Sequence, residues 1–149
     1  MSFEKPVKIT ENLFLGGINS TKNIEYLKEI GITDIINLAG KPNMMNDFAR
    51  VYEAHFPDEN DFDIKPIFMK TIDYMEGLVK DERKKNVKML VHCLGGVSRS
   101  PSLVIGFLMK TMKLNYEDAF KLVKGKKKGI HPNSSFVKQL KELEPLLLL

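Results

Sequence analysis

The stretch that decides the fold is MLVHCLGGVSRSP, residues 89–101, which continues into an apolar helical pattern. Its first residues predict a short buried strand, its glycines predict a tight loop, and Pro101 suits the first turn of a helix. A strand that enters a helix through such a loop directs several backbone N–H groups, and the positive end of the helix dipole, at one point. This order of elements predicts an anion-binding loop in a protein of the α/β class.

Two side chains of this stretch give the predicted loop its chemistry. Cys93 stands at the start of the loop and Arg99 at its end. Convergent N–H groups, a helix end and a guanidinium each favour the thiolate of Cys93 over its thiol. Arg99 can donate two parallel hydrogen bonds to one phosphate, which aligns the phosphorus with the sulfur. The stretch therefore predicts a phosphate site with its own nucleophile, whose phosphate-binding residues are Leu94, Gly95, Gly96, Val97, Ser98 and Arg99.

A simpler interpretation makes Cys93 a buried structural cysteine in an ordinary connection between a strand and a helix. That interpretation has to treat the glycine of the loop, the hydroxyls of Ser98 and Ser100 and the proline of the helix start as coincidences. His92 on its own is more typical of a strand residue than of a catalyst. We expect His92 to support the site by hydrogen-bonding the loop or the thiolate.

Residues 92–100 also resemble a known motif. They have the form HCxxGxSRS, which is similar to the loop of the dual-specificity phosphatases within the cysteine-dependent protein tyrosine phosphatase superfamily. The resemblance implies a phosphocysteine intermediate on Cys93 and binding of the transition state by Arg99. It also implies that the Ser100 hydroxyl assists when the thiolate leaves. It implies neither a metal ion nor an organic cofactor.

Weaker likeness to the same family extends over nearly the whole chain. Residues 13–16 and 35–38 resemble its opening segments, and residues 132–140 resemble its closing PNxxFxxQL segment. Asn133, in that closing segment, is expected to support the site. Only the cysteine loop is highly specific among these segments.

The acidic run at residues 57–63 is the expected source of a proton donor. A departing seryl or tyrosyl oxygen needs a proton as the P–O bond breaks, and a carboxylic acid on a loop over the phosphate site can supply it. Asp63 precedes a long apolar stripe and Pro66, so we expect it to start a helix instead. The resemblance places the acid six residues before the first apolar residue of that helix, Ile64, which selects Asp58. Asp61 is the second candidate.

Length and composition indicate the number of domains, the cellular compartment and whether a segment could cross a membrane. The chain has 149 residues, of which 43% are hydrophobic, and we expect residues 1–149 to form a single domain. Its one cysteine cannot form an internal disulfide and suits the cytoplasm, with the nucleus as a second compartment. The first residues do not resemble a signal peptide. No segment reaches the ~20 apolar residues that cross a bilayer, so the apolar tail at 146–149 is expected to be a docking or frayed end.

The formal charge of +4 is modest, but five lysines are clustered within residues 121–128. This cluster is a solvated face, an import-like run or a surface that attracts anionic substrate. Nucleic acid is not an expected partner, because the cluster has no interleaved aromatic residues. The three histidines lack metal-ligand spacing, and no metal site is expected. The clustered residues are Lys121, Lys124, Lys126, Lys127 and Lys128.

The rest of the chain predicts an α/β fold with a central mixed, largely parallel sheet flanked by helices. Strands are expected at 7–9 and 13–15, as a pair at one edge, and at 32–38 and 51–56. Ser20 is expected to cap a helix that ends at Gly31, and Asn115 to cap a later helix. Residues 125–129 are expected to be a basic loop.

These patterns favour a protein phosphatase that acts on phosphotyrosine and on phosphoserine or phosphothreonine. The expected partner is a phosphorylated protein, and the oligomeric state is left open. Three alternatives remain. One is a phosphoprotein-binding module that turns over weakly, and another is a phosphatase of phosphoinositides or glucans. The third is a sulfurtransferase or an arsenate reductase, and the latter would need further cysteines, which this chain lacks. The absence of lysine at positions 94, 95 and 97 argues against substrates with several phosphates.

Overall fold

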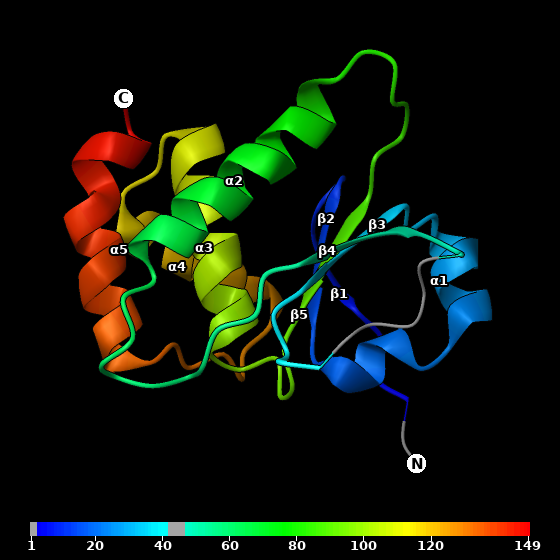
Figure 1. The fold of residues 1–149 in the computed structure, drawn as a ribbon, viewed down its shortest axis with the longest axis horizontal. Helices are drawn as coiled ribbons and strands as arrows, with labels where there is room; N and C mark the ends of the chain where they lie inside the picture. Colours follow the sequence, from blue (N-terminus) through cyan, green and yellow to red (C-terminus); the bar gives the residue numbers. More distant parts are fainter. Residues whose placement is uncertain (1–2, 42–46) are drawn as a thin grey trace.

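A computed structural model describes residues 3–41 and 47–149 and contains one sheet of five strands (Figure 1). The strand order is β1-β2-β5-β3-β4, with β1 antiparallel to β2 and all other neighbours parallel. This confirms a mixed, largely parallel sheet with a hairpin at one edge. The strands are β1 Val7–Thr10, β2 Leu13–Gly16, β3 Asp34–Asn37, β4 Arg50–Glu53 and β5 Met89–His92.

Helices cover both faces of this sheet, as predicted. On the central strand β5, Met89 and Val91 belong to the large apolar core under α2 to α5, whereas Leu90 packs with Leu27 of α1 on the other face. This alternation is what a strand buried on both sides requires. Figure 1 shows α1 on one side of the sheet and the remaining α-helices on the other. The helices are α1 Ile24–Ile30, α2 Lys65–Lys80, α3 Arg99–Met112, α4 Tyr116–Lys126 and α5 Ser134–Leu147.

The first helix does not begin where the sequence predicts. Ser20 lies in the short 3-10 helix η1, Ile18–Thr21, where its hydroxyl donates to the Gly17 carbonyl at 2.5 Å. The cap of α1 is Asn23, whose side chain accepts a hydrogen bond from the Tyr26 N–H at 3.0 Å. Gly31 ends the helix with φ of 88°, as predicted.

Three other boundaries also differ from the prediction. The strand expected at 32–38 covers 34–37, and the strand expected at 51–56 covers 50–53. These residues form the four pairs between the two strands. Asn115 caps α4 as predicted, but α4 continues to Lys126. A single glycine costs a helix only about 1 kcal/mol relative to alanine, so Gly125 does not end α4. Only part of the expected basic loop therefore lies outside the helix.

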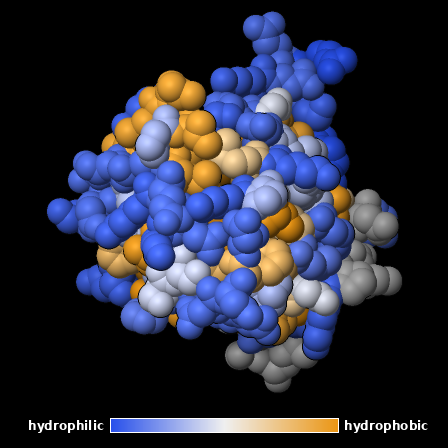
Figure 2. Space-filling model, turned by 60° about the vertical axis from the view of Figure 1, so that its left-hand side comes forward, coloured by the Kyte–Doolittle hydropathy of each residue, from blue (hydrophilic) through white to orange (hydrophobic). Residues whose placement is uncertain are grey.

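The carboxyl-terminal end is ordered rather than frayed. The last helix runs to Leu147, which is fully buried, and Lys113 Nζ donates to the Leu149 carbonyl. Leu146 and Leu149 remain exposed, and Figure 2 shows apolar patches within a mainly hydrophilic face of the molecule. No helix in the described part of the chain is long and apolar enough to cross a membrane.

Candidate active site

The loop between β5 and α3 turns its carbonyl groups outward. The Ile18 N–H donates to the Leu94 carbonyl at 2.9 Å, the His131 N–H to the Val97 carbonyl at 2.7 Å, and Lys127 Nζ to the Gly96 carbonyl at 3.0 Å. By contrast, the backbone N–H groups of residues 94, 95 and 97–99 donate to no described residue. Outward carbonyls and unengaged N–H groups at the start of α3 are the arrangement that an anion needs.

Gly96 is the residue that allows this conformation. Its φ is 71°, in the left-handed region, and a methyl group there would lie 2.7 Å from Gly17 N and 2.8 Å from the Gly16 carbonyl carbon. The positive φ and the close approach to the backbone of residues 16 and 17 would each disfavour a side chain here, whether or not a phosphate is bound. A side chain at position 96 would therefore push the loop away from the end of β2.

We expect Gly96→Ala to lower the free energy of unfolding by about 1–3 kcal/mol, because a strained φ and a backbone clash act together. Gly95→Ala is the matched control, since its methyl group would meet only Val97 Cγ2 at 3.9 Å. The control should change stability by less than about 0.5 kcal/mol. Thermal unfolding of both variants measures the difference, and equal losses would show that the backbone at Gly96 can relax without cost.

Cys93 lies at the base of the loop with its sulfur engaged by two groups. It is 2% exposed, its Sγ accepts from the Gly96 N–H at 3.2 Å, and Ser100 Oγ lies 3.2 Å away. The buried Ser100 hydroxyl is also 3.1 Å from the Gly16 carbonyl. A hydroxyl has one hydrogen, so Ser100 can donate to that carbonyl beside a thiol and to the sulfur once a thiolate forms.

Arg99 is held by one of its three nitrogens. Nη1 donates to the Leu38 and Phe56 carbonyls, each at 3.1 Å. Nε and Nη2 bond to no described residue. Arg99 and Cys93 line the same pocket of about 510 Å³. Nη1 of the guanidinium is thus fixed by the protein, and the N–H groups of its other two nitrogens remain for an anion.

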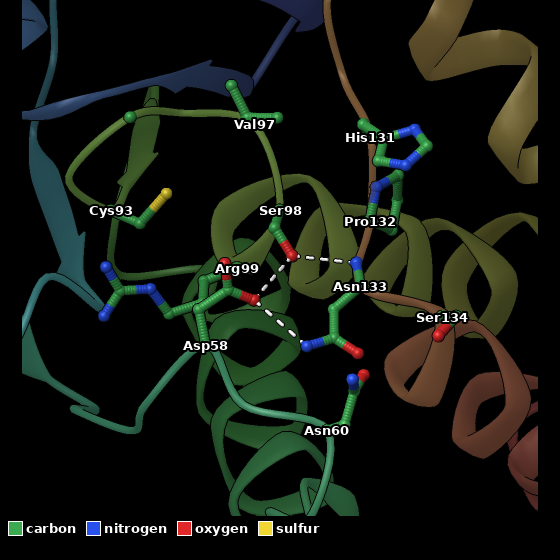
Figure 3. A pocket seen from close by; sticks show the side chains of 11 residues that line it. Asp58, Asn60, Cys93, Val97, Ser98, Arg99, His131, Pro132, Asn133 and Ser134 are labelled. Atoms are coloured by element: carbon green, nitrogen blue, oxygen red, sulfur yellow. Dashed lines mark hydrogen bonds between the residues drawn. The ribbon is translucent and has the colours of Figure 1, made fainter.

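Asp58 lies in this pocket, as Figure 3 shows. Its Oδ1 accepts a hydrogen bond from Ser98 Oγ at 2.8 Å and lies 3.4 Å from Asn133 Nδ2. The Asn133 N–H in turn donates to Ser98 Oγ at 2.8 Å. The predicted supporting residue Asn133 therefore touches the predicted acid Asp58 directly. Only Oδ1 is engaged by these bonds, so the second carboxylate oxygen is left for a substrate.

The other acidic candidates lie elsewhere. Asp61 and Asp63 line a neighbouring hollow with Lys65 and Glu142, and neither lines the pocket that contains Cys93. Asp63 Oδ1 accepts a hydrogen bond from the Lys65 N–H at 3.1 Å, next to the start of α2, as predicted. The structure thus brings Asp58, and not Asp61, to the cysteine loop.

The loop that carries Asp58 is tied to α5 by a residue that sequence analysis missed. Gln139 Oε1 accepts from the Ile64 N–H at 2.8 Å, and Gln139 Nε2 donates to the Phe62 carbonyl at 2.9 Å. At the other end of the loop, the Phe56 ring packs against Phe136 with ring centroids 5.8 Å apart. Phe136 and Gln139 are the F and Q of the PNxxFxxQL pattern, which was the available signal.

His92 supports the backbone of the loop. Its Nδ1 lies 3.3 Å from the Cys93 carbonyl, and because a carbonyl can only accept, Nδ1 carries the proton. Burial lowers the pKa of His92 from its ordinary 6.5, which keeps the ring neutral. The unfolded chain binds this proton more readily, so the contribution of His92 to stability falls as the pH drops below 6.5.

A metal site is not evident in the described residues. They contain no group of three or more His, Cys, Asp or Glu side chains that could hold a metal ion.

Comparisons with known proteins agree with this geometry. Residues 13–145 match the family model described as "Dual specificity phosphatase, catalytic domain". Human dual specificity protein phosphatase 9 is 35% identical over 149 residues, which cover 97% of this chain and 37% of that protein. The chain thus spans well under half the length of this curated relative.

Solved structures show the same fold. The human tyrosine phosphatase-like serine/threonine/tyrosine-interacting protein superimposes with a TM-score of 0.86 at 31% identity, over 97% of this chain and 98% of that one. Human DUSP28 gives a TM-score of 0.86 at 26% identity, over 97% of this chain and 95% of that one. Because the family model matches most of its length, the chain belongs to the dual specificity phosphatase catalytic domain family.

Proposed function

We propose that residues 1–149 act as one catalytic unit that hydrolyses phosphotyrosine and phosphoserine or phosphothreonine in proteins through a phosphocysteine intermediate. The observation that carries this proposal is the shared pocket of Cys93, Arg99 and Asp58. A nucleophile, a bidentate cation and a carboxyl group around one anion cradle are the parts that phosphoryl transfer to a thiolate requires.

In the first step, the loop N–H groups and the Nε and Nη2 edge of Arg99 hold the phosphate oxygens. The Cys93 thiolate attacks phosphorus, the S–P bond forms and the bond from phosphorus to the substrate oxygen breaks. Asp58, protonated at the start, gives its proton to that oxygen, so that an alcohol or phenol leaves.

In the second step, a water molecule hydrolyses the phosphocysteine. The Asp58 carboxylate takes a proton from this water as its oxygen attacks phosphorus. The S–P bond breaks, inorganic phosphate forms and the sulfur leaves as a thiolate. Ser100 Oγ, at 3.2 Å from Sγ, donates its hydrogen bond to the departing sulfur.

The mouth of the pocket favours a protein substrate over a lipid with several phosphates. Leu94 and Val97 are 44% and 40% exposed on the loop, and Gly95 lies between them, so these three positions add no cationic side chain to that of Arg99. Lys127 is directed to the Gly96 carbonyl. An apolar rim suits the side chains that flank a phosphorylated residue in a peptide. It offers no positive charge to balance the negative charge of additional phosphate groups.

The binding-module alternative has a specific observation in its favour. One structural neighbour is described as phosphatase-like and as an interacting protein. In this chain, however, both Cys93 and Arg99 are present and their functional atoms reach the same pocket. We therefore favour a catalytic function over a function in binding alone. A thiol that has to stay reduced in order to act fits the cytoplasm or the nucleus.

Release of phosphate from three matched substrates tests the proposal. These are a phosphotyrosine peptide, the same peptide with phosphothreonine, and a phosphoinositide in detergent. Turnover of both peptides, with little release from the lipid, is the expected result. Binding of the peptides without any release would favour the binding module instead. Preferential release from the lipid would assign a non-protein substrate.

A further inference from the structure

Arg99 is oriented by the backbone of two segments, one of which continues into the loop that carries Asp58. The Leu38 carbonyl lies just beyond the end of β3, and the Phe56 carbonyl lies beyond the end of β4. Pairing between these strands ends with Asn37 opposite Glu53, followed by one further bond from the Ala54 N–H to the Asn37 carbonyl at 2.9 Å. Beyond this bond, no backbone hydrogen bond between the described residues after β3 and those after β4 joins the segments that carry the Leu38 and Phe56 carbonyls.

Three side chains take over where the ladder stops, and we call them the polar clamp: Asn37, Glu53 and His55. Asn37 Nδ2 donates to Glu53 Oε1 at 2.6 Å and to the Lys41 carbonyl at 2.7 Å. Asn37 Oδ1 accepts from the Ala39 N–H at 2.9 Å. Asn37 is 1% exposed, and its bond with the Ala39 N–H is buried, whereas its bonds with Glu53 and Lys41 are part-buried.

His55 closes the polar clamp from the side of β4. Its Nδ1 accepts a hydrogen bond from the Gly40 N–H at 2.8 Å, so the neutral ring carries its proton on Nε2. Nε2 lies 3.2 Å from Glu53 Oε1. The Gly40 N–H is therefore bonded directly to a side chain that follows β4. The Ala39 N–H and the Lys41 carbonyl are bonded to Asn37 of β3, whose side chain is in turn bonded to Glu53 of β4. The segment after β3 and the segment after β4 cannot move apart without breaking these contacts.

We infer that the polar clamp is a positioning device for Arg99, which fixes the two carbonyls that hold Nη1 and thereby directs Nε and Nη2 toward the phosphate. This inference rests on the proposed function. Arg99 sits on a long flexible side chain, and its benefit for the transition state depends on orientation. Two acceptors on one nitrogen restrict rotation of the guanidinium, provided that the acceptors themselves are fixed.

Asn37→Ala tests the inference in a double-mutant cycle with Arg99→Lys. In the wild-type background, Asn37→Ala should lower kcat for a phosphotyrosine peptide by about tenfold or more, with KM changed less than about twofold. In the Arg99→Lys background the same change should cost less than about twofold, because a lysine cannot use the fixed orientation. Equal losses in both backgrounds would overturn the inference, since a purely structural role is additive.

Two further variants separate positioning from folding. Asn115→Ala is the stability-matched control, because it removes a helix cap far from the pocket and should leave kcat unchanged. Glu53→Gln keeps an acceptor oxygen for Asn37 and His55 and should retain near wild-type kcat, whereas Glu53→Ala should lose activity as Asn37→Ala does. If Asn37→Ala does not fold, the cycle is run with Glu53→Ala. Equal activity of the two Glu53 variants would contradict the inference.

Orthovanadate binding distinguishes failure of the inference from failure of the proposed function. Vanadate becomes five-coordinate when a thiolate sulfur adds to it, with three equatorial oxygens in a trigonal arrangement, and this binding needs no turnover. Asn37→Ala should weaken vanadate about tenfold while leaving inorganic phosphate within about twofold. A wild-type protein that binds vanadate but releases no phosphate from any substrate would refute the function alone. Unchanged vanadate affinity in Asn37→Ala would refute the positioning role, whatever the activity.

Discussion

Cys93→Ser is expected to reduce phosphate release by at least ~10⁴-fold while phosphopeptide binding is retained. In the proposed mechanism the sulfur forms the covalent bond, and a serine hydroxyl in the same place is a far weaker nucleophile at neutral pH. Binding survives because the anion is held by backbone N–H groups and Arg99, neither of which needs the sulfur. Steady-state kinetics gives the first quantity, and calorimetric titration with a phosphotyrosine peptide gives the second.

Two controls make this result specific to the thiolate. Iodoacetate should alkylate the wild-type protein at about pH 6, where an ordinary thiol is almost entirely protonated, and Cys93 is the sole cysteine that it can modify. Ser100→Ala should bind phosphopeptide normally and accumulate phosphoenzyme, because the departing sulfur loses its hydrogen-bond donor. Wild-type turnover by Cys93→Ser would end the covalent proposal.

Asp58→Asn should affect substrates according to their leaving groups. An alkyl phosphate departs as a poor alkoxide and should lose the full ~10²- to 10⁴-fold contribution of a general acid. An aryl phosphate with a stable phenolate should lose much less. The wild-type profile of kcat/KM against pH should be bell-shaped, and its descending limb at high pH should flatten in Asp58→Asn, since that limb reports loss of the proton donor.

Asp61→Asn and Asp63→Asn are the matched controls for this experiment. They remove the same charge from the same acidic run, but their side chains lie in the neighbouring hollow. Both should keep the descending limb and the alkyl phosphate activity. The assignment of the acid moves to Asp61 if that variant loses the limb while Asp58→Asn retains it.

The part of the site that is local in sequence was predictable, and the part that is assembled by the fold was not. Residues 92–100 contain the proposed nucleophile, the cation and the glycine, so their nearness in the sequence and the strand, loop and helix pattern around them were enough to predict one loop. Asp58 lies forty positions from Ser98, its hydrogen-bond partner in the pocket, and it was selected by resemblance to a family. Its contacts with Ser98 and Asn133 depend on how α5 packs, which periodicity does not specify.

A sequence does not reveal which backbone carbonyls will accept hydrogen bonds from a functional side chain. Leu38 and Phe56 read as core residues, and their side chains are buried, yet their carbonyls hold Arg99. The wrong cap of the first helix has a similar cause. Serine and asparagine both cap helices, and an unpredicted 3-10 turn moved the helix start from Ser20 to Asn23.

The attachment of the Asp58 loop to α5 has a consequence during synthesis. A chain emerging from a ribosome exposes Cys93 and Arg99 well before Phe136 and Gln139, which tie down that loop. Contacts of such long sequence separation form late, after most of the entropy of chain closure has been lost. In the proposed mechanism, a nascent chain would therefore carry Cys93 before Asp58 is held in place, and both steps of the reaction would become possible only once α5 has docked.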